Sequence, residues 1–394
     1  PCRTILPCRA REPSPTQPAT MSGSLPIVID LGSSRIRAGS AGQQLPDVDI
    51  PSIVGVPKHD KVLPSSMSDS RGGSSEVFLG DDAQKHRGIC KISYPMQHGT
   101  VVDWDSMEQL LNHTLDLLSF PNGPVLMTEA PFTTRKQRKQ LAQYLFEKRS
   151  MPFMHFATQA VLGLFSVGLD TGVVMDIGDG VTQVVPVVEG YSISQSIKRI
   201  DLGGSDVTDR MMHLLRESGQ VFHTSAEREM VREMKEQVGM VSLPLSSSWQ
   251  HSEQDRISYV LPDGHAFDIA TEHFLAPEVL FQPDILGLEH PGIHQLLHNA
   301  IKKADHDLRT PLYKSIILTG GTSNLKDLPN RVLWELRKIA PHDMKIKVKR
   351  PSECQYAAWI GGSLLARLDS FSSWWISKQE YAEKGDSVFD SSSF

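Results

Sequence analysis

The sequence predicts an α/β protein of two lobes, each built on a mixed sheet, and two phrases of similar pattern lead to that prediction. Val173–Pro186 reads VVMDIGDGVTQVVP, an apolar strand that ends in Asp-x-Gly-Asp-Gly and is followed by an alternating strand. Ile27–Gly39, IVIDLGSSRIRAG, repeats this plan near the start of the chain. Each phrase is typical of a hairpin with a carboxylate at the end of its first strand. Strands alternate with helices around both hairpins, which favours a mixed sheet in each half.

Glycine turns of this kind have a structural and a functional interpretation. Asp-Gly is an ordinary hairpin turn, and for either hairpin alone this is the simpler interpretation. Glycine also lets backbone N–H groups approach phosphate oxygens, and a carboxylate at the turn can hold a hydrated Mg²⁺. A third apolar strand, Ser315–Gly321 (SIILTGG), also ends in glycines. The three turns together favour a nucleotide between two facing halves.

The first half of the chain is read from its apolar spacing and its turn residues. The elements expected, in order, are a hairpin at Ile27–Asp30 and Ile36–Ala38, an apolar segment at Pro51–Pro57, strand Val77–Leu79, helix Val101–Leu118, strand Pro124–Met127, helix Arg135–Arg149, strand Phe153–Phe156 and helix Thr158–Gly168. Lys58–Ser75 is polar and rich in Ser and Gly, so it is predicted to be a mobile loop, a kind of segment that often has a function.

The second half follows the same alternation after the central hairpin. The elements expected are helices Asp206–Ser218 and Ala226–Gly239, hairpin Tyr259–Ile269, helix His294–Ala304, strand Ser315–Gly321, helix Arg331–Ile339, strand Lys345–Val348 and helix Ala357–Leu368. Thr224 or Ser225 with Glu227 supplies the start signal of the second helix. Ser242–Arg256 is a polar excursion, and Phe281–Gly292 is a loop with exposed apolar residues at Ile285, Leu286 and Leu288.

Composition narrows the class of protein. A chain of 394 residues can form two domains or one large bilobed unit. A net charge of −6 argues against direct binding of nucleic acid, and no apolar run reaches the ~18–20 residues of a membrane span. The four cysteines show no metal-binding spacing, which fits a reducing, cytoplasmic compartment. Residues 1–21 are predicted to be a disordered leader without the apolar core of a secretory signal.

A set of phrases in the same order resembles actin and the actin-related proteins. The phrases are SIVG (Ser52–Gly55), YPMQHG (Tyr94–Gly99), LMTEAPFT (Leu126–Thr133), TQAVLGL (Thr158–Leu164), AEREMVREMKE (Ala226–Glu236), LPDG (Leu261–Gly264), WIGGS (Trp359–Ser363) and WISKQEY (Trp375–Tyr381), with the two hairpins. The resemblance covers almost the whole chain after the leader, from Pro26 to beyond Trp375. Some phrases also resemble centractin-type actin-related proteins.

The resemblance implies an actin-like fold of four subdomains with a nucleotide cleft between the lobes. Residues 22–158 and 357–394 would form the small lobe, with 52–93 as subdomain 2. Residues 159–356 would form the large lobe, with 203–288 as subdomain 4. The cleft would hold ATP or ADP with Mg²⁺ or Ca²⁺.

Site residues carry over from the resemblance position by position. Asp30, Gly32, Ser33 and Ser34 would cradle the β and γ phosphates, and Arg37 would reach them. Asp176 would lie by the cation and the attacking water, which Gln159 would orient. Asp30 and Asp176 would hold the cation through water. The second phosphate loop would consist of Gly178, Asp179 and Gly180. Adenine and ribose would be bordered by Lys235 and Glu236. The third nucleotide loop would consist of Gly320, Gly321 and Thr322.

The chain departs from the family pattern at positions that matter for catalysis and base binding. Ser34 stands where actins have Gly, and its Cβ could narrow the turn if that position needs a positive φ. Ile177 replaces a Ser, and Gln183 replaces a His near the catalytic water. Asn324 and Leu325 replace a Met-Tyr pair, and Gln355 replaces a Lys beside adenine. We therefore expect ATP binding with slow or absent hydrolysis.

The function implied is that of an actin-related cytoskeletal protein. It would act as a filament protomer or as a subunit of a fixed cytoskeletal or motor-adaptor complex, with other actin-family protomers or complex subunits as partners. The altered loop Lys58–Ser75 favours the fixed complex slightly. Phe371, Trp374 and Trp375 would either lie in a small-lobe cleft that binds a partner's amphipathic helix or form ordinary core. The alternatives are a nuclear chromatin-complex subunit and, less favoured, a phosphotransferase of the same superfamily.

Overall fold

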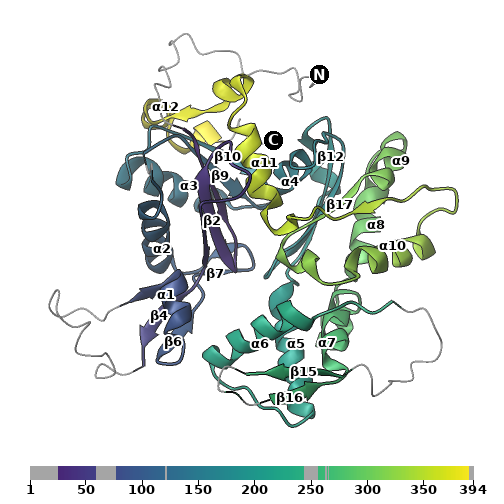
Figure 1. Cartoon of the computed structure of the whole chain (residues 1–394). Helices are drawn as coiled ribbons and strands as arrows, with labels where there is room; N and C mark the ends of the chain where they lie inside the picture. The colour runs from purple at the N-terminus through teal and green to yellow at the C-terminus, as the bar shows by residue number, and fades with distance from the viewer. Residues whose placement is uncertain are drawn as a thin grey trace.

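The computed structural model describes residues 25–58, 77–119, 122–243, 256–261, 264 and 266–389, and it has two lobes with a sheet in each (Figure 1). The expected leader, 1–21, lies outside these residues. The expected loop at 58–75 and the excursion at 242–256 also lie outside them, apart from their end residues Lys58, Ser242, Leu243 and Arg256. None of the helices within the described ranges is long and apolar enough to cross a membrane.

The first sheet is built around the N-terminal hairpin. Its strands are β1 (Ile27–Leu31), β2 (Arg35–Ser40), β3 (Val48–Pro51), β9 (Val125–Glu129), β10 (Phe153–Thr158) and β19 (Ile376–Ser377), in the order β19-β10-β9-β1-β2-β3. β1 is antiparallel to β2 and parallel to β9. The hairpin predicted at this position is therefore confirmed.

The second sheet repeats this plan around the central hairpin. Its strands are β11 (Gly172–Ile177), β12 (Thr182–Val188), β13 (Tyr191–Ser192), β14 (Lys198–Ile200), β17 (Ile316–Thr319) and β18 (Val348–Lys349), in the order β13-β12-β11-β17-β18 with β14 beside β12. β11 is antiparallel to β12 and parallel to β17. The acidic residue that ends the first strand is thus at the same place in both sheets.

Three smaller sheets lie at the far ends of the lobes and near the cleft. Their strands are β4 (Val54–Pro57), β5 (Phe78–Leu79) and β6 (Cys90–Ser93); β7 (Met96–Gln97) and β8 (Thr100–Val101); and β15 (Ile257–Val260) and β16 (Ala266–Ile269). The pair β15–β16 confirms the hairpin predicted at 259–269.

Helices cover both sheets, and most lie where apolar spacing predicts them. The α-helices are α1 (Gly80–Lys85), α2 (Trp104–Asp116), α3 (Arg135–Gln143), α4 (Gln159–Phe165), α5 (Gly204–Glu217), α6 (Ser225–Val238), α7 (Glu272–Leu275), α8 (Ile293–Lys303), α9 (His306–Lys314), α10 (Leu328–Ile339), α11 (Ala357–Leu365) and α12 (Lys378–Lys384). Short 3-10 segments are Ser194–Ser196, Ala276–Leu280, Pro283–Leu286, Gly321–Asn324, Cys354–Tyr356, Asp369–Trp374 and Gly385–Phe389. The predicted signal at α6 is confirmed, because Thr224 and Glu227 form a capping box.

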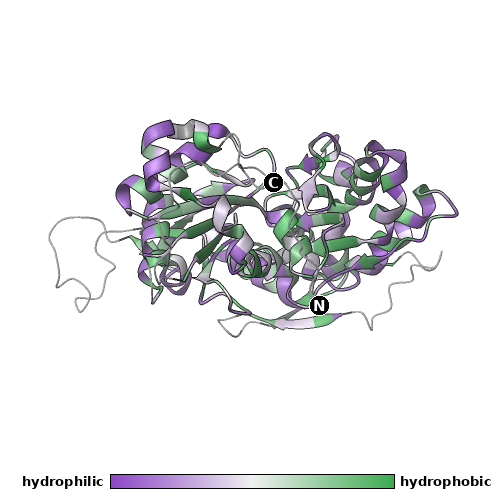
Figure 2. Cartoon of the chain, turned by 90° about the horizontal axis from the view of Figure 1, so that it is seen from above, coloured by the Kyte–Doolittle hydropathy of each residue, from purple (hydrophilic) through white to green (hydrophobic). Residues whose placement is uncertain are grey.

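The central strands β1, β9, β11 and β17 are buried on both faces, which explains their nearly continuous apolar runs. Along β1, Val28 points into a core shared between the lobes, whereas Ile27 and Ile29 point into the small-lobe core. Along β11, Val174 joins the shared core and Val173 joins the large-lobe core. Figure 2 shows the same arrangement, with hydrophobic strands inside and hydrophilic residues on the outer helices.

The two lobes meet where α4 and α11 cross within the shared core, near the centre of Figure 1. The crossing is very close at Gly361, where an added Cβ atom would lie 1.8 Å from the carbonyl oxygen of Leu162. Trp359, also on α11, donates its indole N–H to the carbonyl of Val28 at 3.0 Å. α11 therefore packs against both α4 and the first strand of the small lobe.

The strand expected at 77–79 is confirmed as β5, but helices α1 and α9 were not predicted, and two other expected elements differ in extent or type. The strand expected at 345–348 is limited to Val348–Lys349. The helix expected at 135–149 changes after Gln143 into a π-helical turn, Tyr144–Lys148, whose wider spacing buries three consecutive residues.

Two expectations about exposed apolar residues also change. In the loop 281–292 Ile285 is exposed, but Leu286 and Leu288 pack against the large-lobe core. Phe371 and Trp375 are buried and contact each other edge to face at 5.4 Å between ring centroids. For these two aromatic residues the core alternative is confirmed.

Candidate functional site

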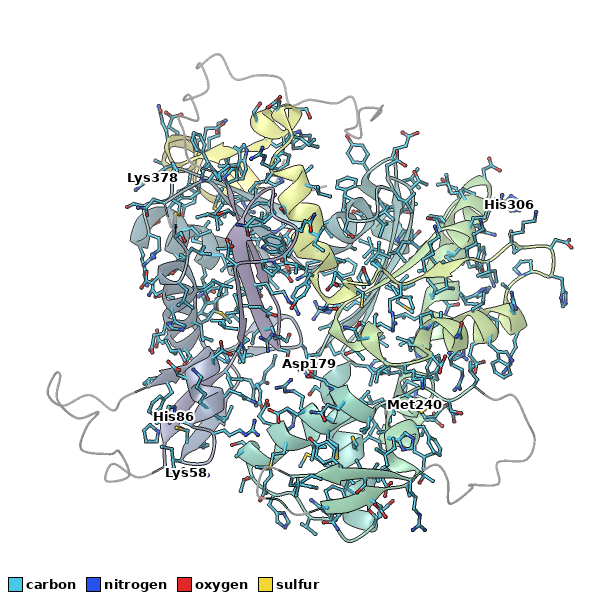
Figure 3. The ribbon with its side chains drawn as sticks, in the orientation of Figure 1. Lys58, His86, Asp179, Met240, His306 and Lys378 are labelled. Atoms are coloured by element: carbon cyan, nitrogen blue, oxygen red, sulfur yellow. The ribbon has the colours of Figure 1, made fainter. Side chains whose placement is uncertain are left out.

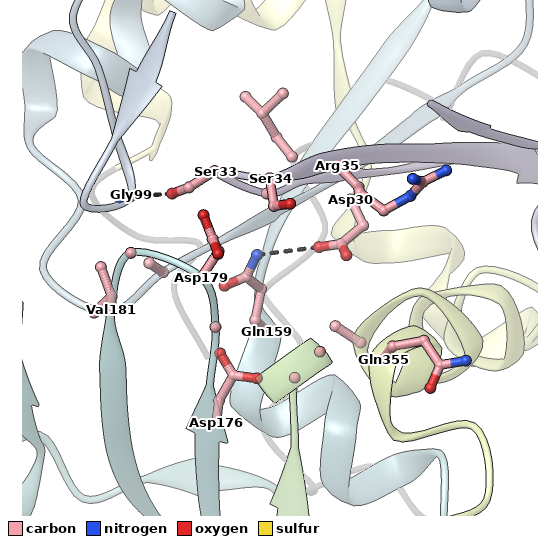
Figure 4. Close-up of a pocket in the computed structure, with 18 of the residues that line it drawn as sticks. Asp30, Ser33, Ser34, Arg35, Gly99, Gln159, Asp176, Asp179, Val181 and Gln355 are labelled. Carbon is pink, nitrogen blue, oxygen red and sulfur yellow. Dashed lines mark hydrogen bonds between the residues drawn. The ribbon is translucent and has the colours of Figure 1, made fainter. Parts of the chain in front are cut away.

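A cavity of about 570 Å³ lies between the lobes, and the carboxyl ends of β1, β11 and β17 open into it. Figure 3 places Asp179 in this central position, and Figure 4 shows part of the lining. All the residues predicted from the sequence as site residues line this one cavity: Asp30, Gly32, Ser33, Ser34, Arg37, Gln159, Asp176, Gly178, Asp179, Gly180, Lys235, Glu236, Gly320, Gly321 and Thr322. Segments almost 300 residues apart in the chain thus meet at one place.

Asp30, at the end of β1, has a nearly complete set of hydrogen bonds. Its carboxylate accepts from Thr128 Oγ1 at 2.6 Å, from Gln159 Nε2 at 3.0 Å and from Arg37 Nη1 at 3.1 Å. The side chain is almost fully buried, so these three donors keep a carboxylate in a site with little water. The contribution of Thr128 was not predicted, because it comes from the neighbouring parallel strand β9.

The turn after Asp30 leaves its backbone close to the cavity. Gly32 N–H donates to the carbonyl of Arg35 at 3.1 Å, and a Cβ on Gly32 would lie 2.7 Å from that oxygen, so glycine is required there. Ser33 Oγ accepts from the backbone N–H of Gly99 at 3.1 Å (Figure 4). Ser34 does not have a positive φ, so the strain considered for this position is absent. The hydroxyl of Ser34 therefore lines the cavity on an ordinary backbone.

Arg37 pairs with carboxylates of the same lobe. Besides its bond to Asp30, its Nε lies 3.7 Å from Asp49 Oδ1, and its guanidinium lies 5.3 Å from the ring centroid of Tyr356. Asp49 also accepts from Tyr356 Oη at 2.9 Å. The Nε of Arg37 is buried and has no hydrogen-bond partner. A positive group with an unused donor thus faces a cavity whose predicted ligand is an anion.

On the large lobe, Asp176 is the next-to-last residue of β11, as Asp30 is of β1. Its carboxylate accepts from Thr319 Oγ1 at 3.0 Å and from Gln183 Nε2 at 3.1 Å. Burial raises the pKa of Asp176, and these two hydrogen bonds oppose that shift. Gly320, the residue directly after Thr319, has φ 89°, and a Cβ there would lie 2.8 Å from Asp176 Oδ1. The predicted third loop therefore needs glycine both for its φ and for the space beside the carboxylate.

The second and third loops are tied to each other. Thr322 Oγ1 donates to the carbonyl of Gly178 at 2.7 Å, and Gly204 N–H donates to the same carbonyl at 3.0 Å. Lys235 is buried and donates from Nζ to the carbonyl of Gly204 at 2.7 Å. Burial lowers the pKa of Lys235, and the nearby Asp179 carboxylate opposes that shift. The large-lobe wall is thus one connected network.

Two carboxamides join Asp30 to Asp176 across the cavity. Gln159 donates to Asp30 (Figure 4), and its Oε1 lies 3.4 Å from Nε2 of Gln183, which in turn donates to Asp176. Gln183 is 2% exposed and its Oε1 has no hydrogen-bond partner. The sequence marked Gln183 as a departure but did not predict that it touches Gln159.

The far wall of the cavity is polar and contains the other departures. Asn324 Nδ2 donates to Gln355 Oε1 at 2.8 Å, and Cys354 Sγ donates to Asn324 Oδ1 at 3.1 Å. Burial raises the pKa of Cys354 to about 11, so this thiol stays protonated at neutral pH. Leu325 is buried beside them. Side chains that lie apart in the sequence therefore close one end of the cavity with amide groups.

The lining fits a nucleotide with a divalent cation. Donors to phosphate are available from the glycine turns, from the Ser33 and Ser34 hydroxyls and from Nε of Arg37, which has no hydrogen-bond partner. Among the described residues, no group of three or more His, Cys, Asp or Glu side chains is arranged to hold a metal ion. A cation near Asp30 and Asp176 would therefore take most of its ligands from phosphate and water, as Mg²⁺ commonly does.

The fold and the cavity define a class: two-lobed α/β proteins whose cleft is lined by glycine turns and a pair of carboxylates. The family model described as Actin matches residues 22–393. An "Actin-like protein" of Neurospora crassa is 45% identical over 374 residues, which cover 92% of this chain and 97% of that protein. The chain belongs to the actin family. The resemblance seen in the sequence and the actin-like α/β fold are thereby confirmed.

Proposed function

We propose that this actin-family chain binds ATP or ADP with Mg²⁺ or Ca²⁺ in the cleft and serves as a structural subunit of a cytoplasmic, cytoskeletal assembly. The observation that carries the proposal is that every residue predicted to contact nucleotide lines the same cavity. Members of the family generally bind ATP or ADP with a divalent cation. In this chain Asp30 and Asp176 would hold the cation through water, and the glycine turns would bind the phosphates.

We propose further that hydrolysis is slow or absent. A water-orienting amide must be free to bind the attacking water. Here the Nε2 of Gln159 is shared by Asp30 and Thr128, and its Oε1 faces the Nε2 of Gln183. Gln183 cannot accept a proton as a neutral imidazole can, so it cannot assist proton removal from that water.

Replacing Gln183 by histidine is expected to raise the rate of single-turnover phosphate release by at least about tenfold, because imidazole supplies a general base beside Gln159. The measurement is release of labelled phosphate from pre-bound ATP. Gln183→Leu is the matched control, since it frees the Oε1 of Gln159 without adding a base, and its rate should stay well below that of Gln183→His. Equal rates for Gln183→His and the wild type would contradict the assigned role of position 183.

We propose that the protein is a subunit of a fixed complex rather than a protomer of a long filament, because the loop sequence at 58–75 diverges from the family pattern. The protein is purified from Met21 onward, its bound nucleotide is extracted and identified, and it is then pelleted at rising concentration with Mg²⁺ and ATP. We expect bound adenine nucleotide and no critical concentration for pelleting. A critical concentration would favour a filament protomer instead, and a cleft that binds no nucleotide would refute the proposed function itself.

A further inference from the structure

The two lobes also touch away from the α4–α11 crossing, where residues in and after α1 meet α6. Arg87, which follows α1, forms a two-pronged ion pair with Glu233 of α6, with Nη1–Oε1 at 2.5 Å and Nη2–Oε2 at 3.3 Å. Gln84 of α1 donates to the same carboxylate at 3.0 Å. The backbone N–H of Ile92 donates to Ser225 Oγ, at the start of α6, at 3.3 Å. Helix α6 is therefore the large-lobe element that the small lobe contacts here.

A second set of bonds runs from this contact along α6 towards the cavity. Tyr94 of the small lobe donates its hydroxyl to Glu229 Oε1 at 2.5 Å. Arg232 donates from Nε to Glu229 Oε2 and from Nη1 to Glu236 Oε1, both at 2.7 Å. Residues 229, 232 and 236 are spaced by three and four, so they share one face of the helix. We name the chain of contacts Tyr94–Glu229–Arg232–Glu236 the α6 relay.

Burial makes the inner part of this relay costly to break. Glu229 is 2% exposed, and its two carboxylate oxygens are used by Tyr94 and Arg232. The side chain of Arg232 is 13% exposed and divides its donors between two carboxylates. A buried charge that loses its partner has no solvent to replace it. Loss of a contact at one end of the relay should therefore weaken the contacts at the other end.

The inner end of the relay is a ligand-facing group. Glu236 lines the cavity, and its side chain is more than half exposed there. A carboxylate accepts hydrogen bonds and repels phosphate, so the ligand group that it can bind is a hydroxyl or amino donor. In a bound nucleotide such donors belong to the ribose and the base.

We propose that Arg232 is a positioning residue that couples the nucleoside contact of Glu236 to the Tyr94–Glu229 contact between the lobes, so that nucleotide release requires the α6 relay to break. This inference rests on the proposed function, namely that the cavity holds a nucleotide. According to this proposal, Tyr94, Glu229 and Arg232 control the rate of nucleotide exchange and take no part in hydrolysis.

The test is the dissociation rate of a fluorescent ADP chased with excess unlabelled ADP, measured on the whole chain. Tyr94→Phe removes one hydroxyl and is expected to speed release about tenfold. Glu236→Gln should speed release as well. In the double variant the release rate should be at least threefold lower than the rate obtained by multiplying the two single accelerations. In an Arg232→Lys background, where one ammonium replaces the forked guanidinium, this non-additivity should disappear.

Tyr144→Phe is the matched control. It removes a buried tyrosine hydroxyl that donates to Asn112 at 2.9 Å inside the small lobe, so the release rate should not change. Effects of Tyr94→Phe and Glu236→Gln that simply multiply would overturn the relay while leaving nucleotide binding intact. A wild-type chain that binds neither fluorescent ADP nor fluorescent ATP would overturn both the relay and the proposed function.

Discussion

Alanine at Gly361 is expected to lower the free energy of unfolding by about 3 kcal/mol or more. The added Cβ would lie 1.8 Å from the carbonyl oxygen and 2.5 Å from the carbonyl carbon of Leu162. Both atoms belong to the backbone of α4, so no side-chain rotation relieves the contact and the two helices must move apart. That movement would open the core shared by the lobes, in which Trp359 and Leu162 are fully buried. Urea denaturation followed by tryptophan fluorescence measures the loss.

Two glycines provide controls for this substitution. Gly362, the next residue, would place its Cβ 2.9 Å from Val28 Cγ1, a side-chain atom that can shift, so alanine should cost less there. Gly88 has open space around the position of a Cβ, and alanine there should change the unfolding midpoint very little. A Gly361→Ala protein as stable as Gly88→Ala would show that the helix crossing is looser than described.

Replacing Asp30 by asparagine is expected to weaken Mg²⁺-dependent ATP binding by about 100-fold or more. In the wild type the Asp30 carboxylate accepts hydrogen bonds from Thr128, Gln159 and Arg37. The asparagine amide has a single acceptor oxygen, and its NH₂ group would point towards one of these three donors. The buried guanidinium of Arg37 also loses a charge partner, and under the proposed function a cation in the cleft would lose one of the two carboxylates assigned to it.

The measurement for Asp30→Asn is a titration with fluorescent ATP, with and without a chelator. The chelator should weaken binding strongly in the wild type and much less in the variant. Glu278→Gln is the control, because Glu278 is another carboxylate that pairs with an arginine, Arg331, but it does not line the cavity. The assignment of Asp30 would be wrong if the chelator affected Asp30→Asn and the wild type equally.

The two hairpins could be predicted because their information is local. An apolar strand, an Asp and a glycine turn lie within about a dozen residues, and the same local pattern occurs twice. Helix α9 could not be predicted in this way, because Pro311 lies inside it and proline normally ends a helix. Its position is fixed by tertiary packing, since Leu312 and Tyr313 are buried in the large-lobe core.

The site shows the same division between local and long-range information. Sequence phrases identified many of the residues that line the cavity, but not the partners that orient them. Thr128 lies 98 positions from Asp30, and Tyr356 lies 307 positions from Asp49. Such pairs depend on strand order and on the approach of the lobes, which no short phrase contains. The contact of Gln183 with Gln159 is another such long-range pair. Because of it, the glutamine at position 183 both replaces a histidine and occupies the amide oxygen of Gln159.

The small-lobe sheet has a consequence for synthesis on the ribosome. β19 pairs with β10, Trp359 donates a hydrogen bond to Val28, and Val388 and Phe389 are buried in the same core cluster as Ile27 and Ile29. The N-terminal strands are therefore made first but completed last, after the intervening large-lobe segment has been translated. At typical elongation rates this leaves their apolar faces without final partners for tens of seconds. During that interval the nascent chain exposes apolar surface that is prone to aggregation, although the finished protein buries most of these residues.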